Sequence, residues 1–379
     1  MRSASGEDRR IALFTSTLGG GGAERVLVNL ASALAAHGHR AELVLSSAAG
    51  PYRDQVPASV PVVDLCASRT IYAVPHLARY LAHARPAALL SALDTANVTA
   101  LAARALARVP TRVVVSIHSP LRVQAAGAVG FVDRWVPRLT RWTYAAADAV
   151  VAVSKGVGDE LAAGTRIPPQ RIRVIYNPVV TSSLLAKAEA PLDHPWFVPG
   201  GPPVFLGVGR LTPQKDFDTL VRAFARVRAL RPARLLVLGE GELRPALEAR
   251  VRTLGIGDDA SLPGFVANPY AYLSRAGAFV LSSAWEALPT VLIEALACGT
   301  PVVSTRCRFG PDEILEGGLH GPLVPVGDDE ALAKAMLAVL ERPPSREVLR
   351  RRADAFSDEA CLADYLEVLL GSSADARCR

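Results

Sequence analysis

The stretch AFVLSSAWEALPTVLIEALACGTPVVST (278–305) contains a strand pattern, a helix pattern and a second strand pattern in direct succession. AFVLSS (278–283) and PVVST (301–305) are short apolar runs, and VLIEALAC (291–298) between them reads as a short helix that Gly299 ends. Strands that are joined through a helix run parallel in one sheet. The stretch therefore predicts a parallel α/β unit.

The same alternation runs through the first half of the chain. Alanine-rich helical patterns such as 23–38 separate short, β-branched apolar runs, and this order is typical of a parallel sheet with helices on both faces. The predicted strands are 11–16, 41–46, 62–65, 87–93, 112–117, 149–154 and 172–177.

The segment 188–203 interrupts the alternation with five prolines and two glycines, and strand patterns resume at 204–210, 234–239, 278–283, 301–305 and 322–326. A chain of 379 residues also exceeds the size at which one core keeps growing. We expect two Rossmann-like domains (1–187 and 204–357) joined by the linker 188–203, with ligands in the cleft between them, beyond the carboxyl ends of the strands. The helical pattern near the C-terminus, within 358–379, has two placements: with the second domain or crossing back to the first.

Composition narrows the class of protein. Half of the residues are hydrophobic, 21% are charged, and the net charge of +6 comes without a basic tail, so anionic partners fit and nucleic acid is not required. The five cysteines are odd in number and lack C-x-x-C spacing, which argues against a disulfide framework or a structural zinc site. The polar start (1–10) and the absence of an apolar run of about 18 residues predict a soluble cytoplasmic protein.

The glycine run LGGGGAERV (18–26) follows the first predicted strand. Glycines at a helix start let backbone N–H groups approach an anionic ligand. A G-x-G-x-x-G fingerprint fails at Glu24, and the next strand ends in Ser46 and Ser47 rather than an acid for a ribose. The run therefore predicts ligand contact without a nicotinamide cofactor.

Two cations follow the first strand of the second half, in GVGRLTPQKDFDTL (207–220). Arg210 and Lys215 at the carboxyl edge of a parallel sheet suit a diphosphate. Asp216 and Asp218 have the spacing of a D-x-D metal site, but they open a helix, where aspartate caps the chain. We expect no metal.

The glutamates of 286–303 lie at the next carboxyl edge. Glu286 belongs to the loop before the predicted helix and Glu294 lies about one turn inside it. Each carboxylate can accept two hydrogen bonds from neighbouring hydroxyls of a sugar or a ribose. The alternative is an ordinary exposed pair. Backbone N–H groups near the helix start (Leu288, Pro289, Thr290, Val291) are placed to receive phosphate.

In this order the motifs resemble those of the family 4 retaining glycosyltransferases (glycosyltransferases group 1), which have the GT-B fold of two Rossmann-like domains. The resemblance covers nearly the whole chain and rests on GGGGAERV (19–26), GVGRLTPQKDFDTLVRAF (207–224), LLVLGEGELRPALE (235–248), LPGFVANPYAYLSRA (262–276) and EALPTVLIEALACGTPVVS (286–304).

The resemblance implies roles for the second-domain residues. Arg210 and Lys215 would bind the donor diphosphate, Glu294 the ribose hydroxyls, and Glu286 the transferred sugar. Backbone around Phe265 and Val266 would meet the base.

In the first domain the resemblance places Gly20 and Gly21 at the distal phosphate and sugar, and His118 at the sugar. Ser119 and Arg122 would lie near the acceptor, whereas Ser154 and Asn177 match family turns and are expected to be mainly structural.

Two stretches depart from the family pattern. Ala287 replaces a common glycine, and Arg308 and Phe309 replace small residues in TRCRFGPDEIL (305–315), a stretch that resembles a segment of lipid-linked glycan assemblers. Both departures bear on which donor sugar is accepted.

A retaining hexosyl or N-acetylhexosaminyl transfer from a nucleotide-diphosphate sugar is therefore expected. The resemblance favours UDP as the nucleotide. Since no carboxylate is obviously placed for a covalent intermediate, we expect front-face departure in which cations stabilise the leaving diphosphate without a metal.

A basic and aromatic segment, VDRWVPRLTRWTYAAADAVV (132–151), suits docking at an anionic membrane surface. A lipid-linked acceptor such as a polyprenyl diphosphate oligosaccharide, polysaccharide biosynthesis for the cell envelope and a peripheral membrane location would agree with this. The alternative is a core helix. The residues concerned are Arg134, Trp135, Arg138, Arg141, Trp142 and Tyr144.

Two other functions compete with sugar transfer. A sugar-nucleotide epimerase of the same architecture needs acid–base carboxylates beside the sugar and no acceptor. A catalytically silent glycan-binding protein would not require Arg210, Lys215, Glu286 and Glu294 together, so their joint presence favours transfer.

Overall fold

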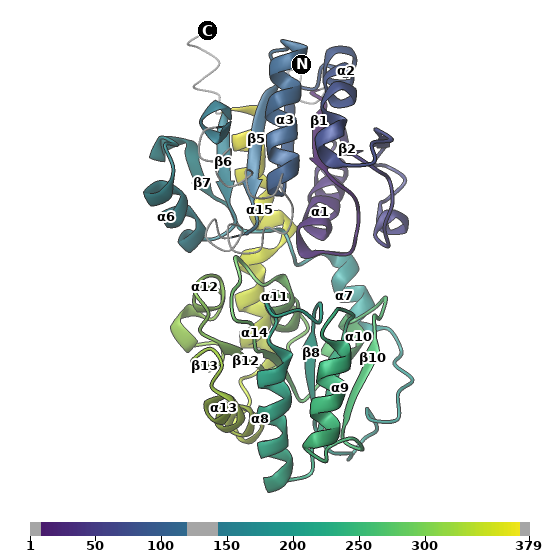
Figure 1. Cartoon of the computed structure of the whole chain (residues 1–379), viewed down its shortest axis with the longest axis vertical. Coiled ribbons are helices and arrows are strands. Elements are labelled where there is room, and N and C mark those ends of the chain that lie inside the picture. Colours follow the sequence, from purple (N-terminus) through teal and green to yellow (C-terminus); the bar gives the residue numbers. More distant parts are fainter. Residues whose placement is uncertain (1–8, 120–142, 372–379) are drawn as a thin grey trace. The chain divides into compact units, whose positions relative to one another are not determined.

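The computed structural model describes residues 9–119 and 143–371, which form two compact units. The first unit consists of residues 1–178 and 358–379, and the second of residues 179–357. Each unit is built on one parallel sheet flanked by helices (Figure 1). The expected GT-B architecture of two doubly wound α/β domains is confirmed.

The first sheet contains all the strands that the apolar runs predicted. Every pairing is parallel, and the strand patterns are almost completely buried in the middle of the sheet. The order across the sheet is β3 (Val62–Asp64), β2 (Ala41–Leu45), β1 (Ile11–Thr15), β4 (Ala88–Ala92), β5 (Arg112–Ile117), β6 (Ala149–Ala152) and β7 (Ile172–Val174).

The main core of the first unit lies between the sheet and two helices, α1 and α15, that are far apart in the sequence. Of the two placements left open for the helical pattern near the C-terminus, the structure has the one in the first unit: the Arg112 guanidinium of β5 donates to the Val368 carbonyl of α15 at 2.9 Å. The helices are α1 (Gly22–Ala36), α2 (Val74–Ala84), α3 (Asp94–Ala107), α6 (Lys155–Gly164) and α15 (Asp358–Leu370).

The second sheet is also entirely parallel. Its edge strand β10 was not predicted, because Pro263 and Gly264 resemble a turn; proline is tolerated at a sheet edge, and the pairing shifts register there. The order is β10 (Ala260–Gly264), β9 (Arg234–Leu238), β8 (Val204–Val208), β11 (Ala278–Leu281), β12 (Val302–Thr305) and β13 (Leu323–Val324).

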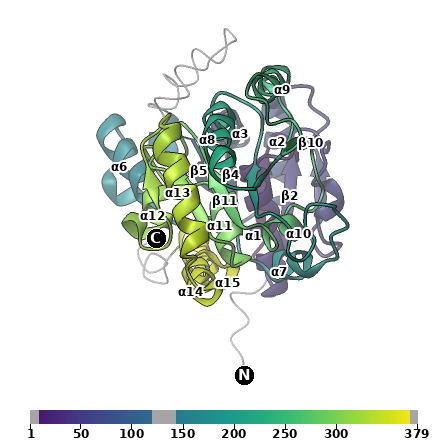
Figure 2. The ribbon, with the colours of Figure 1, turned by 90° about the horizontal axis from the view of Figure 1, so that it is seen from below.

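Amphipathic helices cover this sheet. The apolar side chains of α8 recur at helical spacing and are buried with those of α9 and α13 in one core, while α11 packs against α14 (Figure 1, Figure 2). The helices are α7 (Ser182–Glu189), α8 (Phe217–Leu230), α9 (Arg244–Thr253), α10 (Tyr270–Leu273), α11 (Thr290–Ala297), α12 (Pro311–Ile314), α13 (Asp329–Glu341) and α14 (Arg346–Ala353).

The boundary between the units lies at residues 178 and 179, earlier than the expected end of the first domain at 187. Helix α7 packs on α10, where the Asn268 amide donates to the Lys187 carbonyl at 2.9 Å and Ser274 donates to Ala188 at 2.8 Å. These contacts attach α7 and the segment 188–203 to the second unit. Proline and glycine content indicated the break in the alternation but not the side on which the segment packs.

Within the part of the chain that the structure describes, no helix has the length and apolar character needed to span a bilayer.

Candidate active site

The second sheet reverses its strand order between β8 and β11. The chain leaves β8 toward β9 and β10 on one side and returns to β11, β12 and β13 on the other. In such sheets the loops after the two strands at the reversal diverge and leave a crevice at the carboxyl edge. Arg210 and Lys215 follow β8, and Glu286 follows β11, so strand order brings the predicted cations and the first glutamate together at the carboxyl edge beside the reversal.

Lys215 and Glu286 form a largely buried ion pair. The Lys215 ammonium lies 2.5 Å from Glu286 Oε1, and the two side chains are only 17% and 7% exposed. The pairing was not predicted, because each residue was expected to contact a ligand. Arg210 is exposed at the same edge of the sheet.

Three further polar residues hold this pair in place, and the sequence interpretation missed them. Ser283 donates to Glu286 Oε1 at 2.8 Å, and the Gln214 amide donates to Glu286 Oε2 at 3.4 Å. Ser282 donates to the Lys215 carbonyl at 2.7 Å. The available signal was two buried serines at the end of an otherwise apolar strand and a glutamine directly before the lysine.

Glu294 lies one turn inside α11, as expected, and is buried. The Tyr270 hydroxyl donates to Glu294 Oε1 at 3.3 Å. Pro289 precedes the first residue of α11, so the N–H groups near the helix start belong to Leu288, Thr290 and Val291, and proline offers none. Most of this helix is apolar and buried, so packing fixes the position of its start.

Phe265 and Val266 follow the edge strand β10 at the same carboxyl edge. The Phe265 ring is 57% exposed, an unusual state for phenylalanine. An exposed ring beside polar loops is suited to stacking on a planar base.

The departures from the family pattern lie in the Glu286 loop and in the segment 308–310 that packs against it. Ala287 is buried, and Gly310 (φ +86°) packs so closely that an added Cβ would lie 2.5 Å from Pro289 Cδ and 3.0 Å from the Ala287 carbonyl. The Arg308 guanidinium lies over the Phe309 ring at 5.0 Å. Close packing of the two loops therefore sets the path of the backbone at residue 287.

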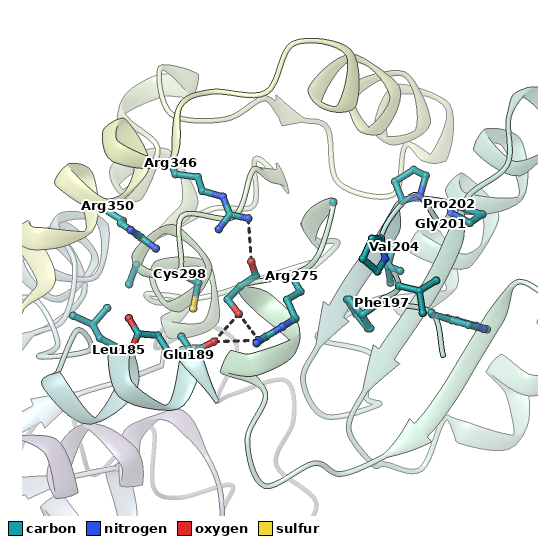
Figure 3. Close-up of a pocket in the computed structure, with 18 residues that line it drawn as sticks. Leu185, Glu189, Phe197, Gly201, Pro202, Val204, Arg275, Cys298, Arg346 and Arg350 are labelled. Atoms are coloured by element: carbon teal, nitrogen blue, oxygen red, sulfur yellow. Dashed lines mark hydrogen bonds between the residues drawn. The ribbon is translucent and has the colours of Figure 1, made fainter. Parts of the chain in front are cut away.

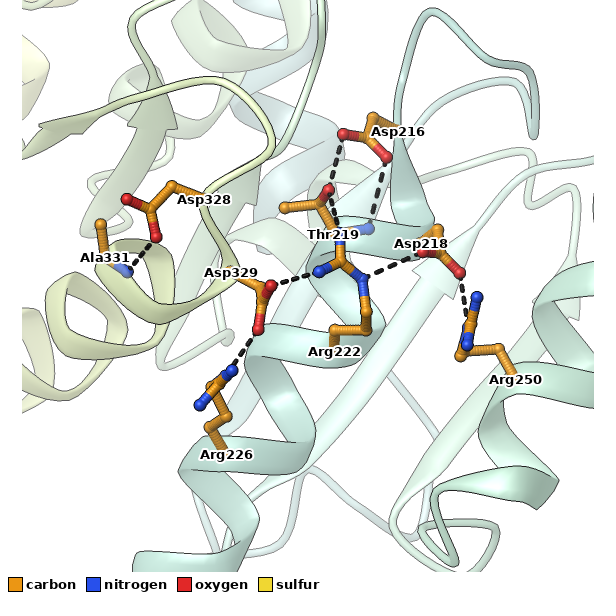
Figure 4. Close-up of polar contacts among 9 residues, drawn as sticks. All are labelled: Asp216, Asp218, Thr219, Arg222, Arg226, Arg250, Asp328, Asp329 and Ala331. Carbon is orange, nitrogen blue, oxygen red and sulfur yellow. Dashed lines mark hydrogen bonds and ion pairs between the residues drawn. The ribbon is translucent and has the colours of Figure 1, made fainter.

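Asp216 and Asp218 serve the fold, as the helix-start interpretation predicted. Asp216 caps α8 by accepting from the Thr219 N–H at 3.3 Å, and Asp218 accepts from Arg222 at 3.0 Å and Arg250 at 2.7 Å (Figure 4). Among residues 9–119 and 143–371, no group of three or more histidine, cysteine or acidic side chains is arranged to hold a metal ion.

The first sheet has its own reversal between β1 and β4. Gly20 and Gly21 follow β1 at that point; Gly20 has φ +96°, and its carbonyl accepts from the Tyr52 hydroxyl at 2.9 Å. The positive φ explains the preference for glycine there. The sequence analysis did not single out the loop after β4. In this loop Leu93 has φ +76°, a costly conformation for a side chain of this size.

A buried polar network follows that strained residue. Asp94, at the start of α3, accepts from the Tyr144 hydroxyl at 2.9 Å, and the Asn97 amide donates to the same hydroxyl at 3.2 Å. Tyr144 is completely buried, so its expected place on a membrane-facing surface is wrong. The other residues proposed for that surface (Arg134, Trp135, Arg138, Arg141, Trp142) lie outside the described part of the chain, as does Arg122.

His118 follows β5, at the carboxyl edge of the first sheet as predicted, and its Nε2 lies 3.0 Å from Ser116 Oγ. Burial lowers the pKa of His118 to about 4, so the imidazole is neutral at pH 7. Ser119 is partly buried beside it. Ser154 caps α6 by accepting from the Val157 N–H at 3.3 Å, which agrees with a structural role, and Asn177 is buried.

A cavity of about 800 Å³ in the second unit lies at the opposite edge of the sheet, where β8 begins and α11 ends (Figure 3). Two of its arginines donate hydrogen bonds to carbonyl groups near the ends of helices. Arg275 donates to the Ala271 carbonyl at 2.9 Å and the Ala188 carbonyl at 3.3 Å, and Arg346 donates to the Ser274 carbonyl at 3.1 Å. The cavity is therefore separate from the predicted site residues of this unit, which lie at the carboxyl edge of the sheet and do not line it.

These features define a class of protein, the GT-B type α/β folds with polar residues at the carboxyl edges of two doubly wound sheets. Comparison with family models then identifies the family. The model for glycosyl transferases group 1 matches residues 192–356, and that for glycosyltransferase family 4 matches residues 20–183. The chain belongs to this glycosyltransferase family.

Individual relatives agree with this membership. An N-acetylgalactosaminyltransferase of Campylobacter jejuni that acts on a diphospho-undecaprenol-linked sugar is 31% identical over 60% of this chain and 61% of its own length. The lipopolysaccharide core biosynthesis glycosyltransferase LpsE of Rhizobium meliloti is 34% identical over 53% of this chain and 58% of its own length. The chain thus spans less than two thirds of these curated relatives.

A solved structure supports the fold. Anabaena HepE in complex with UDP-glucose superposes with a TM-score of 0.75 at 19% identity, and the match covers 95% of this chain and 99% of HepE.

Proposed function

We propose that this protein transfers a hexose or N-acetylhexosamine from a UDP-sugar to a glycan or a lipid-linked glycan. The observation that carries the proposal is the buried Lys215–Glu286 pair at the strand reversal of the second sheet, with Arg210 and Glu294 at the same edge. Charged side chains are mostly exposed unless they are paired, and this pair lies where parallel sheets of this kind bind their ligands.

The cations account for the leaving group. Lys215 has three N–H donors, of which Glu286 takes one, so the ammonium can also meet a diphosphate oxygen. Arg210 lies five positions before Lys215 at the same edge of the sheet and is exposed, so it would add a second positive charge. Two cations stabilise the negative charge that develops on a departing diphosphate.

The carboxylates account for the sugars. Glu294 on the rigid helix α11 would accept from ribose hydroxyls, while Glu286 would accept from hydroxyls of the transferred sugar. The base would stack near Phe265. Gly20, Gly21 and His118, at the carboxyl edge of the first sheet, are proposed as further donor-binding residues, and the neutral imidazole of His118 can either donate or accept a hydrogen bond.

The proposed stereochemistry is retention by front-face departure. The bond between the anomeric carbon and the β-phosphate oxygen breaks as the acceptor oxygen bonds to the same face of that carbon. The departing phosphate oxygen takes the acceptor's proton.

The acceptor is proposed from relatives. One acts on a diphospho-undecaprenol-linked sugar and another in lipopolysaccharide core biosynthesis, by their names. A lipid-linked acceptor would bring the enzyme to the cytoplasmic face of a membrane as a peripheral protein. Sedimentation with liposomes that contain anionic lipid tests this location, and no binding to such vesicles would refute it.

The activity is tested with a panel of UDP-sugars and polyprenyl diphosphate saccharides. We expect release of UDP with formation of a glycoside whose anomeric configuration, read by NMR, matches that of the donor. An isomerised donor would indicate an epimerase, and an unchanged donor a binding protein. Turnover that persists in EDTA would agree with a metal-independent reaction. Lys215→Ala should abolish most turnover, and unchanged transfer in that variant would refute the assigned role.

A further inference from the structure

We infer that Gln214 is a positioning residue that aims one oxygen of Glu286 at the transferred sugar. The inference deepens the proposed function and rests on it. It starts from an asymmetry between the two oxygens of the Glu286 carboxylate.

Glu286 Oε1 is occupied by two strong donors, the Lys215 ammonium at 2.5 Å and the Ser283 hydroxyl at 2.8 Å. Among residues 9–119 and 143–371, Glu286 Oε2 accepts only a long bond, from the Gln214 amide at 3.4 Å. A carboxylate oxygen has about two lone-pair sites, so Oε2 keeps one for a ligand. Oε2 is therefore the oxygen available to a sugar hydroxyl.

The Gln214 amide has one orientation that suits its surroundings. Its Nε2 donates to the Trp285 carbonyl at 3.1 Å as well as to Glu286 Oε2. Both neighbours are acceptors, so the NH₂ group must face them, and a flipped amide would set three oxygens against one another. The Gln214 side chain thus fixes the plane of the Glu286 carboxylate relative to the backbone of the loop that carries Glu286.

A purely structural role is not needed at this position. Other hydrogen bonds already join the two loops: the Ala284 backbone N–H donates to the Gln214 carbonyl at 2.8 Å, and the Ser282 hydroxyl donates to the Lys215 carbonyl at 2.7 Å. The side-chain amide adds an interaction directed at the carboxylate. Its loss should affect how the sugar is held more than how the loops fold.

The test is Gln214→Glu, which keeps the size of the side chain and replaces its NH₂ by an oxygen. Two carboxylates at hydrogen-bond distance cannot both stay ionised without strong repulsion, and a shared proton restores the hydrogen bond. We expect kcat to fall about tenfold at pH 8 and to recover as the pH is lowered toward 5.5. Gln214→Met, which lacks a donor, should lose activity without such recovery.

UDP binding provides the second readout. Since Gln214 contacts the sugar-facing carboxylate, the affinity of Gln214→Met, which adds no charge beside Lys215, for UDP alone should stay within about twofold of that of the unaltered protein when measured by calorimetry. Gln170→Glu is the matched control for Gln214→Glu: it makes the same chemical change at an exposed glutamine of the first unit and should not change the pH profile.

The outcomes separate the two levels of the proposal. No transfer by the unaltered protein with any UDP-sugar would refute the proposed function. Transfer by the unaltered protein, with Gln214→Glu giving the same pH profile and kcat, would overturn the role of Gln214 alone. A UDP affinity of Gln214→Met lowered in parallel with its kcat would also overturn it, by showing a general disruption of the site.

Discussion

The Lys215–Glu286 pair should contribute measurably to stability, and a double-mutant cycle can isolate that contribution. The variants are Lys215→Met, Glu286→Gln and the two combined. Removing one member of a buried pair leaves an uncompensated charge, at a cost of about 3–5 kcal/mol. Ser283 and Gln214 still donate hydrogen bonds to the carboxylate when the ammonium is lost, so we expect a smaller cost, about 2–3 kcal/mol for Lys215→Met.

The double variant carries no unpaired charge, so its destabilisation should be smaller than the sum of the single values by about 2 kcal/mol. Urea unfolding followed by circular dichroism gives the values, and hydrogen exchange of the α11 amides assigns the transition of the second unit. Because the pair is buried, 0.5 M salt should change the coupling little.

The exposed Lys334–Glu330 pair of α13 is a matched control of similar length, at 2.7 Å. Its coupling should not exceed about 0.5 kcal/mol, since solvent screens exposed pairs. Additive effects of Lys215→Met and Glu286→Gln would refute the reasoning, because they would mean that the two charges do not interact.

Three further predictions concern other parts of the fold. His118 has a pKa of about 4 in the folded protein and about 6.5 in the unfolded chain, so its contribution to stability is complete above pH 6.5 and falls by about 1.4 kcal/mol per pH unit toward pH 4. His118→Asn should therefore flatten the pH dependence of the unfolding free energy between pH 7 and 4.5. An unchanged slope would contradict the assignment. Gly310→Ala should destabilise the second unit and reduce transfer, because the added Cβ would clash with Pro289. The control Gly327→Ala has a similar φ but open space around it, so it should cost only the backbone strain. Equal losses of stability in thermal unfolding would argue against the contact. Asp216→Ala should cost about 1 kcal/mol through loss of the α8 cap, less in Asp216→Gly because φ is +43°, and a stability equal to that of the unaltered protein would exclude the cap as a contributor.

Local pattern was sufficient for most of the fold. Apolar runs such as 112–117 and 204–208 are buried strands, and helical spacing of apolar residues over 217–230 is the buried face of α8. The edge strand β10 was not predicted, because its Pro263–Gly264 pair resembles a turn. Its place at the sheet edge is what permits a proline within the strand.

The candidate site was accessible from sequence only in part. Lys215 and Glu286 could be assigned to carboxyl edges because each follows a strand pattern. Their contact spans 71 positions and exists because β8 and β11 are neighbours at the strand reversal, an order that no local pattern encodes. The burial of Tyr144 likewise depends on Asp94, fifty positions away.

By itself the sequence determined the alternation of strands and helices, the glycines with positive φ at turns, and the residue types at the strand ends, since each depends on near neighbours along the chain. Tertiary structure alone decided which of these residues meet. The pairing of Lys215 with Glu286, the hydrogen bond that Gln214 gives to Oε2, and the attachment of α7 to the second unit all arise from strand order and side-chain packing between distant segments.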